Sequence, residues 1–334
     1  MRILHRLRPL TVRGRDKMFH ENFDFLLTEN TYSRLTKNQS FIEIDSMKNL
    51  SSSIEQTITF YDLFDYPLTA NEIFNNLFQP TQDYSYFELI KTLEMNNTLE
   101  FDQGFYFLPG RFEIVAKRKK RYLITEQKIK NNLKYIKLLS RIKAIKTIFI
   151  CNTVAYHNAQ EDSDLDLFII TRKNRIWSTR LLTTLLMKIF NKRPTKTDQK
   201  DKICLSFFIT EDNLSLENIA IKNDVYLYYW ISQLLPIYDP ENLHKEFWQG
   251  NNWLKKYLPN ADLKITNTRW QVKDALLKFP TLPEYLARKI QLKKMPNHLK
   301  KLSQENNTNV IINDKILKFH DQDKRVKIRE QFFK

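Results

Sequence analysis

Two aspartates one residue apart, Asp164 and Asp166, stand at the start of the apolar stretch DLDLFIIT. Side chains on a β-strand alternate between the two faces of the sheet, so the two carboxylates are expected to project side by side. Leu165, Leu167 and Ile169 then face the opposite side. Neighbouring carboxylates repel each other unless a cation lies between them. The spacing therefore favours a site for a hard divalent cation such as Mg²⁺, which one or two carboxylates and the phosphates of a substrate can hold.

The aspartates follow a predicted buried strand and a polar loop. The apolar run IKTIFIC over residues 145–151 predicts the strand, and NTVAYHNAQEDS over residues 152–163 predicts the loop. Strand, loop and the motif SDLDLFII resemble the nucleotidyltransferase fold of the DNA polymerase β superfamily, whose signature is Gly-Ser, a loop and Asp-x-Asp. With YDLFDYPLTANEI, GFYFLPGR and ILKFHDQDKR, residues 53–330 resemble bacterial nucleotidyltransferase-domain proteins that carry an N-terminal winged helix.

The resemblance implies an activity and its site residues. Asp164 and Asp166 would be the catalytic residues and would hold Mg²⁺ or Mn²⁺, while an NMP is transferred from an NTP to an acceptor. Glu161 and Asp162 lie outside the alternation and are expected to be solvated. The residues expected to contact the nucleotide are Asn152, Thr153, Ser163, Arg172 and Arg180. For the two arginines, a solvated position at the start of a helix is the alternative.

The Gly-Ser pair of the signature is replaced here by Asn152 and Thr153. Glycine allows the backbone to approach phosphate with a positive φ angle, and Asn is the next most tolerant residue in that conformation. Thr153 keeps a hydroxyl group for a phosphate oxygen. This replacement is expected to preserve the turn.

The family's third carboxylate is also replaced. It comes from a neighbouring strand, and the matching segment here is ICLSFFIT over residues 203–210. Strict alternation puts Cys204 and Ser206 on one face of that strand, with Leu205, Phe207 and Ile209 on the other. Ser206 then occupies the third-acid position, where a hydroxyl group cannot act as a metal-bound base.

Residues 53–110 carry the pattern of a winged helix. Thr69 with Glu72, and Ser85 with Glu88, are spaced as capping boxes at the starts of two helices. Two short alternating segments around Asp-Gln-Gly follow and predict a hairpin. The third helix has only one basic residue, so packing or protein contact is favoured over reading of a nucleic acid, which stays the alternative. Its inward-facing side chains are expected to be Phe87, Leu89, Ile90 and Leu93.

Residues 111–144 predict a long basic linker helix. Between residues 111 and 146 there are thirteen Lys and Arg against two Glu, and apolar residues recur at helical spacing. One interpretation is a solvated linker and the other is a surface that contacts phosphate groups of a polyanion. The densest part of this basic patch is Lys117, Arg118, Lys119, Lys120 and Arg121.

The remaining patterns predict the fold class, the domain bounds and the cellular location. The predicted fold class is α+β, with a mixed-sheet nucleotidyltransferase core over residues 145–240, a helical region over 241–334 and a disordered or loosely ordered extension over 1–52. The two cysteines are interpreted as packing residues rather than as a disulfide or metal ligands, and HDQD over residues 320–323 as a surface cap. No apolar run is long enough for a membrane span, so no membrane partner is expected. The two buried cysteines, with no CxxC pair, favour a reducing cytoplasm.

Two classes of function remain. The first is an Mg²⁺-dependent nucleotidyltransferase whose acceptor is RNA (more than DNA), a protein or a small molecule. The clustering of bases in the predicted linker helix, rather than the net charge of +16, favours a polyanion. The second is a catalytically weak or inactive nucleotide-binding protein that acts as a sensor, a regulator or a toxin–antitoxin-type partner. With four glycines in the chain and no matching motif, the sequence offers neither a P-loop nor a GxSxG nucleophile turn.

Overall fold

The computed structural model describes residues 29–334 apart from 196, 267 and 306, with side chains from residue 45 onward. The chain divides into two compact units, residues 1–46 and 47–334. Helix α1 spans Glu29–Asp62, so the extension expected over residues 1–52 is helical from residue 29, and residues 1–28 lie outside the described part. Leu50 is buried together with Ile54 and Ile58, because residues four apart share one helix face.

Three elements after α1 follow the predicted pattern. They are α2 (Ala70–Asn75), α3 (Tyr86–Met95) and the antiparallel hairpin of β1 (Glu100–Asp102) and β2 (Phe105–Phe107). Both predicted capping boxes are present: the Thr69 and Ser85 side chains each accept from an N3 backbone NH, and Glu72 and Glu88 reach back. These local hydrogen bonds set where both helices begin.

Short-range geometry also determines the hairpin turn and the buried face of α3. Gln103 and Gly104 both have positive φ angles, 49° and 89°, as a two-residue turn between strands requires. On α3 the buried apolar residues are Leu89 and Leu93, whereas Phe87 is 76% exposed. The expectation that Phe87 points inward was therefore wrong, because it lies off the stripe that residues 89 and 93 define.

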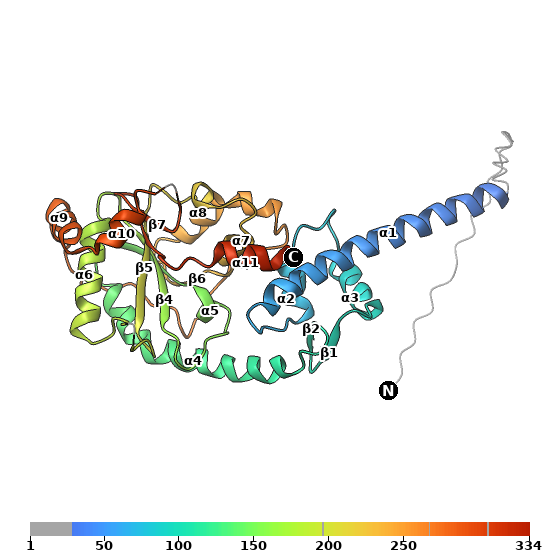
Figure 1. Cartoon of the computed structure of the whole chain (residues 1–334), viewed down its shortest axis with the longest axis horizontal. Helices are drawn as coiled ribbons and strands as arrows, with labels where there is room; N and C mark the ends of the chain where they lie inside the picture. Colours follow the sequence, from blue (N-terminus) through green and yellow to red (C-terminus); the bar gives the residue numbers. More distant parts are fainter. Residues whose placement is uncertain (1–28, 196, 267, 306) are drawn as a thin grey trace, which may run out of the picture. The chain divides into compact units, whose positions relative to one another are not determined.

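A six-stranded mixed sheet forms the centre of the second unit (Figure 1). Its order is β6-β3-β4-β5-β8-β7, with β4 and β5 parallel and every other pair antiparallel. The strands are β3 (Ile145–Ile150), β4 (Leu165–Thr171), β5 (Ile203–Thr210), β6 (Leu235–Tyr238), β7 (Val310–Ile312) and β8 (Ile316–Phe319). The predicted α+β class with a mixed sheet is confirmed.

The remaining helices surround this sheet. They are α4 (Glu113–Leu139), α5 (Asn152–Ala155), α6 (Ile176–Ile189), α7 (Val225–Gln233), α8 (Leu243–Gly250), α9 (Glu284–Lys294), α10 (Asn297–Leu302) and α11 (Arg325–Phe332). Short 3₁₀ turns cover Glu217–Ile219 and Asn252–Lys256. None of the helices within the described residues has the length and apolar character needed to cross a bilayer.

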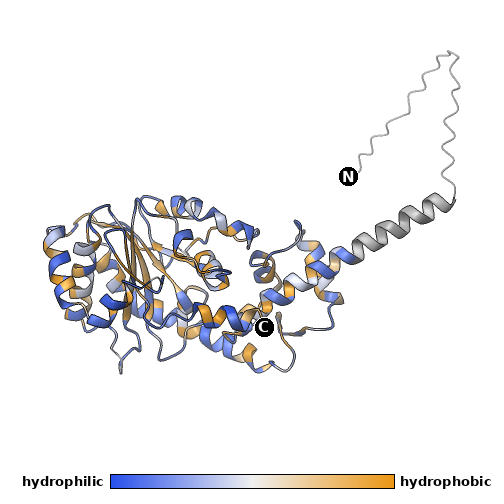
Figure 2. Cartoon of the chain, turned by 45° about the horizontal axis from the view of Figure 1, so that its top comes forward, coloured by the Kyte–Doolittle hydropathy of each residue, from blue (hydrophilic) through white to orange (hydrophobic). Residues whose placement is uncertain are grey.

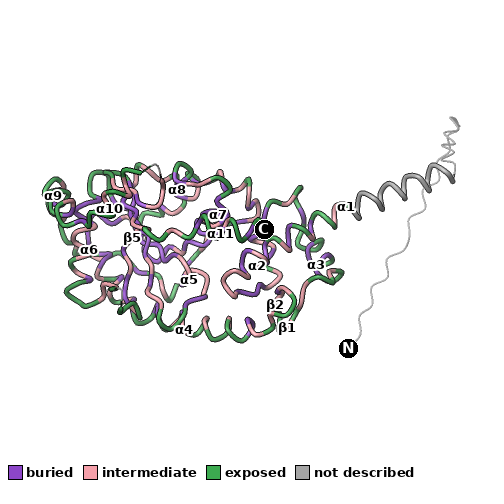
Figure 3. The backbone as a smooth tube through the Cα atoms, in the orientation of Figure 1, coloured by how far each residue is buried: buried purple, intermediate pink, exposed green. Residues whose placement is uncertain are grey.

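Two apolar cores lie against opposite faces of the sheet. One contains Phe168 and Phe207 with residues of α7 and α8, and it continues into α1–α3. The other contains Leu165 and Leu167 with residues of α4, α6 and α9. Hydrophobic residues concentrate on the inner sides of the helices (Figure 2), and the buried backbone follows the central strands (Figure 3). The sheet is therefore covered on both faces, which fixes the ends of its strands in place.

Residues 241–334 contribute strands as well as helices, because β7 and β8 pair as a hairpin and β8 extends the sheet beside β5. The strict alternation expected for β5 was wrong, because its register with β4 shifts along the strand. Phe207 was expected on the sheet face opposite Cys204, but it packs in the same core as Phe168. One extra residue in a strand reverses which face the later side chains occupy.

Candidate active site

Asp164 and Asp166 lie at the amino-terminal end of β4, immediately before and just inside the strand. Leu165 and Leu167 belong to the core on the other face, as the alternation predicted. Both aspartates are partly buried, whereas Glu161 and Asp162 are exposed. The backbone therefore presents two adjacent carboxylates on one face.

The electrostatic state of this pair differs from that of two surface carboxylates. Burial, and then the charge of Asp166, raises the pKa of Asp164, and burial likewise raises the pKa of Asp166. Hydrogen bonds from Asn152 and Cys204 oppose the rise at Asp166. Two partly buried carboxylates whose charged forms are disfavoured form an environment that a bound cation would stabilise.

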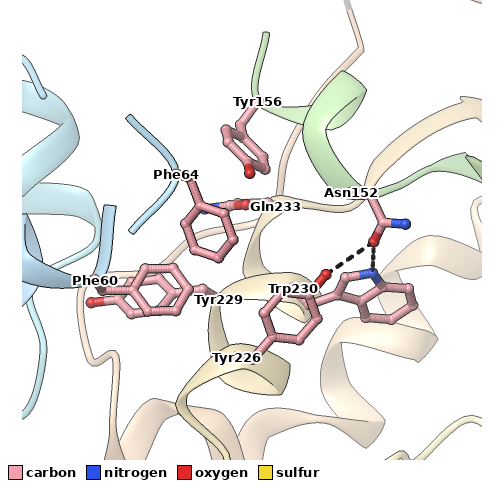
Figure 4. A pocket seen from close by; sticks show the side chains of 8 residues that line it. All are labelled: Phe60, Phe64, Asn152, Tyr156, Tyr226, Tyr229, Trp230 and Gln233. Atoms are coloured by element: carbon pink, nitrogen blue, oxygen red, sulfur yellow. Dashed lines mark hydrogen bonds between the residues drawn. The ribbon is translucent and has the colours of Figure 1, made fainter. Parts of the chain in front are cut away.

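Asn152 follows β3 directly and has a φ angle of 55°. The positive φ predicted for this position is therefore confirmed. Its Oδ1 accepts hydrogen bonds from Trp230 Nε1 (2.9 Å) and Tyr226 Oη (3.3 Å), which are dashed in Figure 4. These bonds orient the side-chain amide so that its NH₂ group can donate to Asp166. Two aromatic residues of α7 thus position the side chain that contacts the acidic pair.

A cleft of about 670 Å³ opens beside Asp166. Its wall includes Asn152 and Thr153 from the start of α5, and Cys204 and Ser206 from β5. Further lining comes from residues 63–65, Arg121, Tyr156, Asn158, Tyr226, Trp230 and residues 318–325. This volume lies in the range of about 300 to 1,000 Å³ typical of small-molecule sites.

His320 is one of the cleft residues that the sequence did not predict. It follows β8, and its Nε2 lies 3.0 Å from Ser206 Oγ. Burial, and then the neighbouring charge of Lys318, lowers the pKa of His320 to about 3, so the ring is neutral at ordinary pH. The interpretation of residues 320–323 as a surface cap was wrong, because β8 pairs with β5 and carries His320 into the cleft.

Cys204 is the second such residue. The parallel register of β4 and β5 places it directly beside Asp166. The ligand atoms of Asp164, Asp166 and Cys204 all lie within 4.8 Å of one another, which is close enough to hold one metal ion. Both cysteines are free thiols, as predicted, but the interpretation of Cys204 as a packing residue alone does not account for this position.

Three of the residues expected at the nucleotide are not brought to the cleft. Arg172 follows the far end of β4, about 20 Å along the strand from Asp166 at the usual rise per residue. Arg180 donates to Gln291 Oε1 (2.6 Å) and packs its guanidinium 4.1 Å from the centre of the Phe319 ring. Ser163 Oγ donates to the backbone oxygen of residue 160 at 2.9 Å. Asn152 and Thr153, by contrast, do line the cleft.

The basic patch on α4 contains two kinds of residue. Arg118 pairs with Glu72 at 2.7 Å, and Arg121 donates to Asn158 Oδ1 at 3.0 Å and to Asp65 at 3.3 Å. Arg118 thus joins α4 to α2, and Arg121 joins α4 to the segment before α2 and to the cleft wall. Lys117, Lys119 and Lys120 have exposed side chains.

Lys128 is a buried cation that the sequence placed among the exterior bases of this helix. Its Nζ donates to the backbone oxygens of Glu161 and Ser163, both at 2.8 Å, and to Asp201 at 3.1 Å. The helical spacing of Ile129 and Ile136 gave no signal for a buried lysine beside that stripe. Lys128 holds the end of the loop that leads into Asp164.

Comparison with protein families, with curated proteins and with solved structures finds no match to this chain.

Proposed function

We propose that this protein is a divalent-metal-dependent nucleotidyltransferase of the DNA polymerase β type with an N-terminal winged helix, which transfers an NMP from an NTP to an acceptor. The observation that carries the proposal is the pair Asp164 and Asp166 on one strand face, with raised pKa values, at a cleft of nucleotide size. The capping boxes, the third helix and the hairpin before α4 support the winged-helix part.

The residues of the pair fit a divalent cation. Asp164 and Asp166 would hold Mg²⁺ or Mn²⁺, because carboxylates are the ligands that such ions prefer and their charges lack a cationic partner at this end of β4 among the described ion pairs. The bound ion would neutralise the triphosphate and stabilise the entering and departing oxygens. The hydrogen bond from Asn152 keeps Asp166 oriented toward the cleft.

The other cleft residues suit the remaining parts of an NTP. Thr153 offers a hydroxyl group to a phosphate oxygen beside the positive-φ turn at Asn152. Aromatic side chains of Phe64 and Tyr156 supply apolar surfaces on which a nucleobase can stack. In the reaction, the acceptor hydroxyl oxygen bonds to the α-phosphorus, the bond to pyrophosphate breaks and the hydroxyl proton passes to solvent.

The acceptor is proposed to be a polyanion, RNA more than DNA, with a protein or a small molecule as alternatives. The exposed lysines along α4 support this choice, since they can approach phosphate groups without breaking an internal ion pair. They include Lys119, Lys120, Lys130, Lys134 and Lys137.

A second candidate is a nucleotide-binding regulatory protein that transfers nothing. It is favoured by one observation: β5 brings Cys204 and Ser206 to the cleft instead of a carboxylate. Such a protein would bind NTP with a divalent cation but would lack the third acid of the family signature.

Incubation with each α-labelled NTP, Mg²⁺ or Mn²⁺ and total cellular RNA tests the proposal. Label on RNA, on the protein or on a small molecule, lost in the Asp164→Asn/Asp166→Asn variant, is the expected result. The matched control is Glu161→Gln/Asp162→Asn, which removes two exposed acids just upstream and should keep full transfer. Metal-dependent NTP binding without transfer selects the regulatory candidate. Absence of NTP binding contradicts both.

A further inference from the structure

The third group beside the aspartate pair is a thiol. Cys204 lies opposite Asp166 in the parallel β4–β5 register, and its Sγ is within 4.8 Å of carboxylate oxygens of both Asp164 and Asp166. We propose that Cys204 is the third ligand of the metal at this site, and that the site therefore selects a divalent cation that accepts sulfur, such as Mn²⁺ or Zn²⁺, over Mg²⁺. This inference rests on the metal pair of the proposed function.

The surroundings of Cys204 keep its side chain at the site. Its thiol is hydrogen-bonded to Asp166 on one side and to the Ser206 hydroxyl on the other. Ser206 Oγ is in turn 3.0 Å from His320 Nε2, and the ring of Phe207 meets the His320 ring edge-on. Partners of this kind orient a metal ligand before the ion arrives. Ser206 is thereby a positioning residue, where the family signature has an acid.

The donor set decides which cations fit. Mg²⁺ requires oxygen ligands in a near-octahedral arrangement, and a thiol in the third position gives it a poor partner. Sulfur ligands favour softer cations, while the two carboxylates remain suitable for Mn²⁺ and Zn²⁺. One thiol with two carboxylates therefore shifts the preference away from Mg²⁺ without excluding phosphate from the remaining positions.

Cys151 provides a matched control within the same sheet. It is a buried free thiol directly after β3, on the other side of β4, and its backbone NH donates to the Asp166 carbonyl at 3.1 Å. It does not belong to the cluster of ligand atoms around Asp164 and Asp166. Substitution of Cys151 tests the effect of losing a thiol near the site without losing the proposed ligand.

The test uses the full-length protein and Cd²⁺ as a thiophilic probe. We expect a sulfur-to-cadmium charge-transfer band in the ultraviolet for the wild type and for Cys151→Ser, and none for Cys204→Ser. In calorimetric titrations, Mn²⁺ should bind more tightly than Mg²⁺, and Cys204→Ser should weaken Mn²⁺ by about tenfold or more, since even outer partners of a metal are worth that much. Cys204→Asp should reverse the preference toward Mg²⁺.

The outcomes separate this inference from the proposed function. Equal Mn²⁺ binding by wild type and Cys204→Ser, with no charge-transfer band, overturns the sulfur ligand and leaves a site made of the aspartates alone. A band that persists in Cys204→Ser but disappears in Cys151→Ser also overturns it. If the wild type binds no divalent cation at all, the metal pair of the proposed function fails as well.

Discussion

Two groups of charged side chains reach the same cleft, one through Asp166 and the other through Lys318, Asp323 and Arg325, and they are built differently. On the β8 side, Lys318 pairs with Asp323 at 2.9 Å, and Arg325 pairs with Asp323 and with Asp224, both at 2.9 Å. Charges alternate there, and each buried group has an opposite partner. On the β4 side, two charges of the same sign stand together, and no described cation lies within ion-pair distance of either one.

Under the proposed function, the paired charges serve the fold and the aspartate pair serves a ligand. Burial raises the pKa of Asp323, but Lys318 and Arg325 more than reverse this and hold it below its usual value. The pKa of Asp164 is raised instead. Paired buried charges are structural in most proteins, while groups with strongly disfavoured charges concentrate at functional sites.

Breaking the paired group should have the largest effect on the fold. Arg325→Met leaves Asp224 and Asp323 buried with one cation between them, so we expect a loss of about 3 to 5 kcal/mol in the free energy of unfolding. Urea denaturation measures it. Arg329→Met, on the same helix but at its partly exposed side, should cost less than about 1 kcal/mol. Equal losses in the two variants would contradict the structural role of the paired group.

Removal of Lys128 should affect both the stability of the fold and the binding of a cation at the aspartate pair. Its ammonium group joins α4 to the loop before Asp164 through two backbone oxygens and also binds Asp201, so Lys128→Met should cost about 2 to 3 kcal/mol of stability. It should also weaken divalent-cation binding, because the loop that carries Asp164 loses its anchor. The exposed neighbour gives the control, Lys130→Met, which should change neither quantity. Full cation affinity in a destabilised Lys128→Met protein would show that the anchor does not position the site.

The basic patch offers the same contrast on one helix. Arg118→Ala removes the ion pair with Glu72 and the stacking of its guanidinium 4.1 Å from the Tyr66 ring centre, and should cost about 1 to 2 kcal/mol. Lys120→Ala should stay within about 0.5 kcal/mol in thermal unfolding. If the acceptor is RNA, Lys120→Ala should lower the affinity of the protein for RNA and make that affinity less dependent on salt concentration. If Arg118→Ala lowers RNA affinity and Lys120→Ala does not, the arginines are the contact surface instead.

Neutralising Asp164 should have the smallest effect on the free energy of unfolding, and it should stabilise the protein rather than destabilise it. Burial raises the pKa values of both acids, and the charge of Asp166 adds to the rise at Asp164, so the favourable contribution of the pair is complete below about pH 4 and is lost as the pH rises through the raised values. In chelator at about pH 8, Asp164→Asn should therefore be more stable than the wild type, on the order of 1 kcal/mol. The difference should shrink toward about pH 4. A variant that is less stable at both pH values would contradict the repulsion.

The sequence predicted best what short-range geometry decides. The capping pairs at Thr69 and Ser85 act over three residues, and the hairpin turn needs only the φ angles of two residues. The carboxylates share a face because a strand alternates, and Asn152 adopts the backbone angle for which Asn is suited.

What it missed depends on contacts between distant segments. Ser206 and His320 are 114 positions apart and meet only because β8 joins the sheet beside β5. Cys204 becomes a candidate ligand through the register of β4 and β5, which alternation within one strand does not reveal. The burial of Lys128 likewise follows from the path of the loop before Asp164.

Calorimetric titration of Mn²⁺ into the wild type and into Asp164→Asn/Asp166→Asn determines whether the start of β4 holds a metal ion. We expect one saturable site in the wild type, loss of that site in the double variant, and unchanged binding in Glu161→Gln/Asp162→Asn. Saturable binding that survives in the double variant, or no binding by the wild type, would contradict the assignment of a metal site to the start of β4.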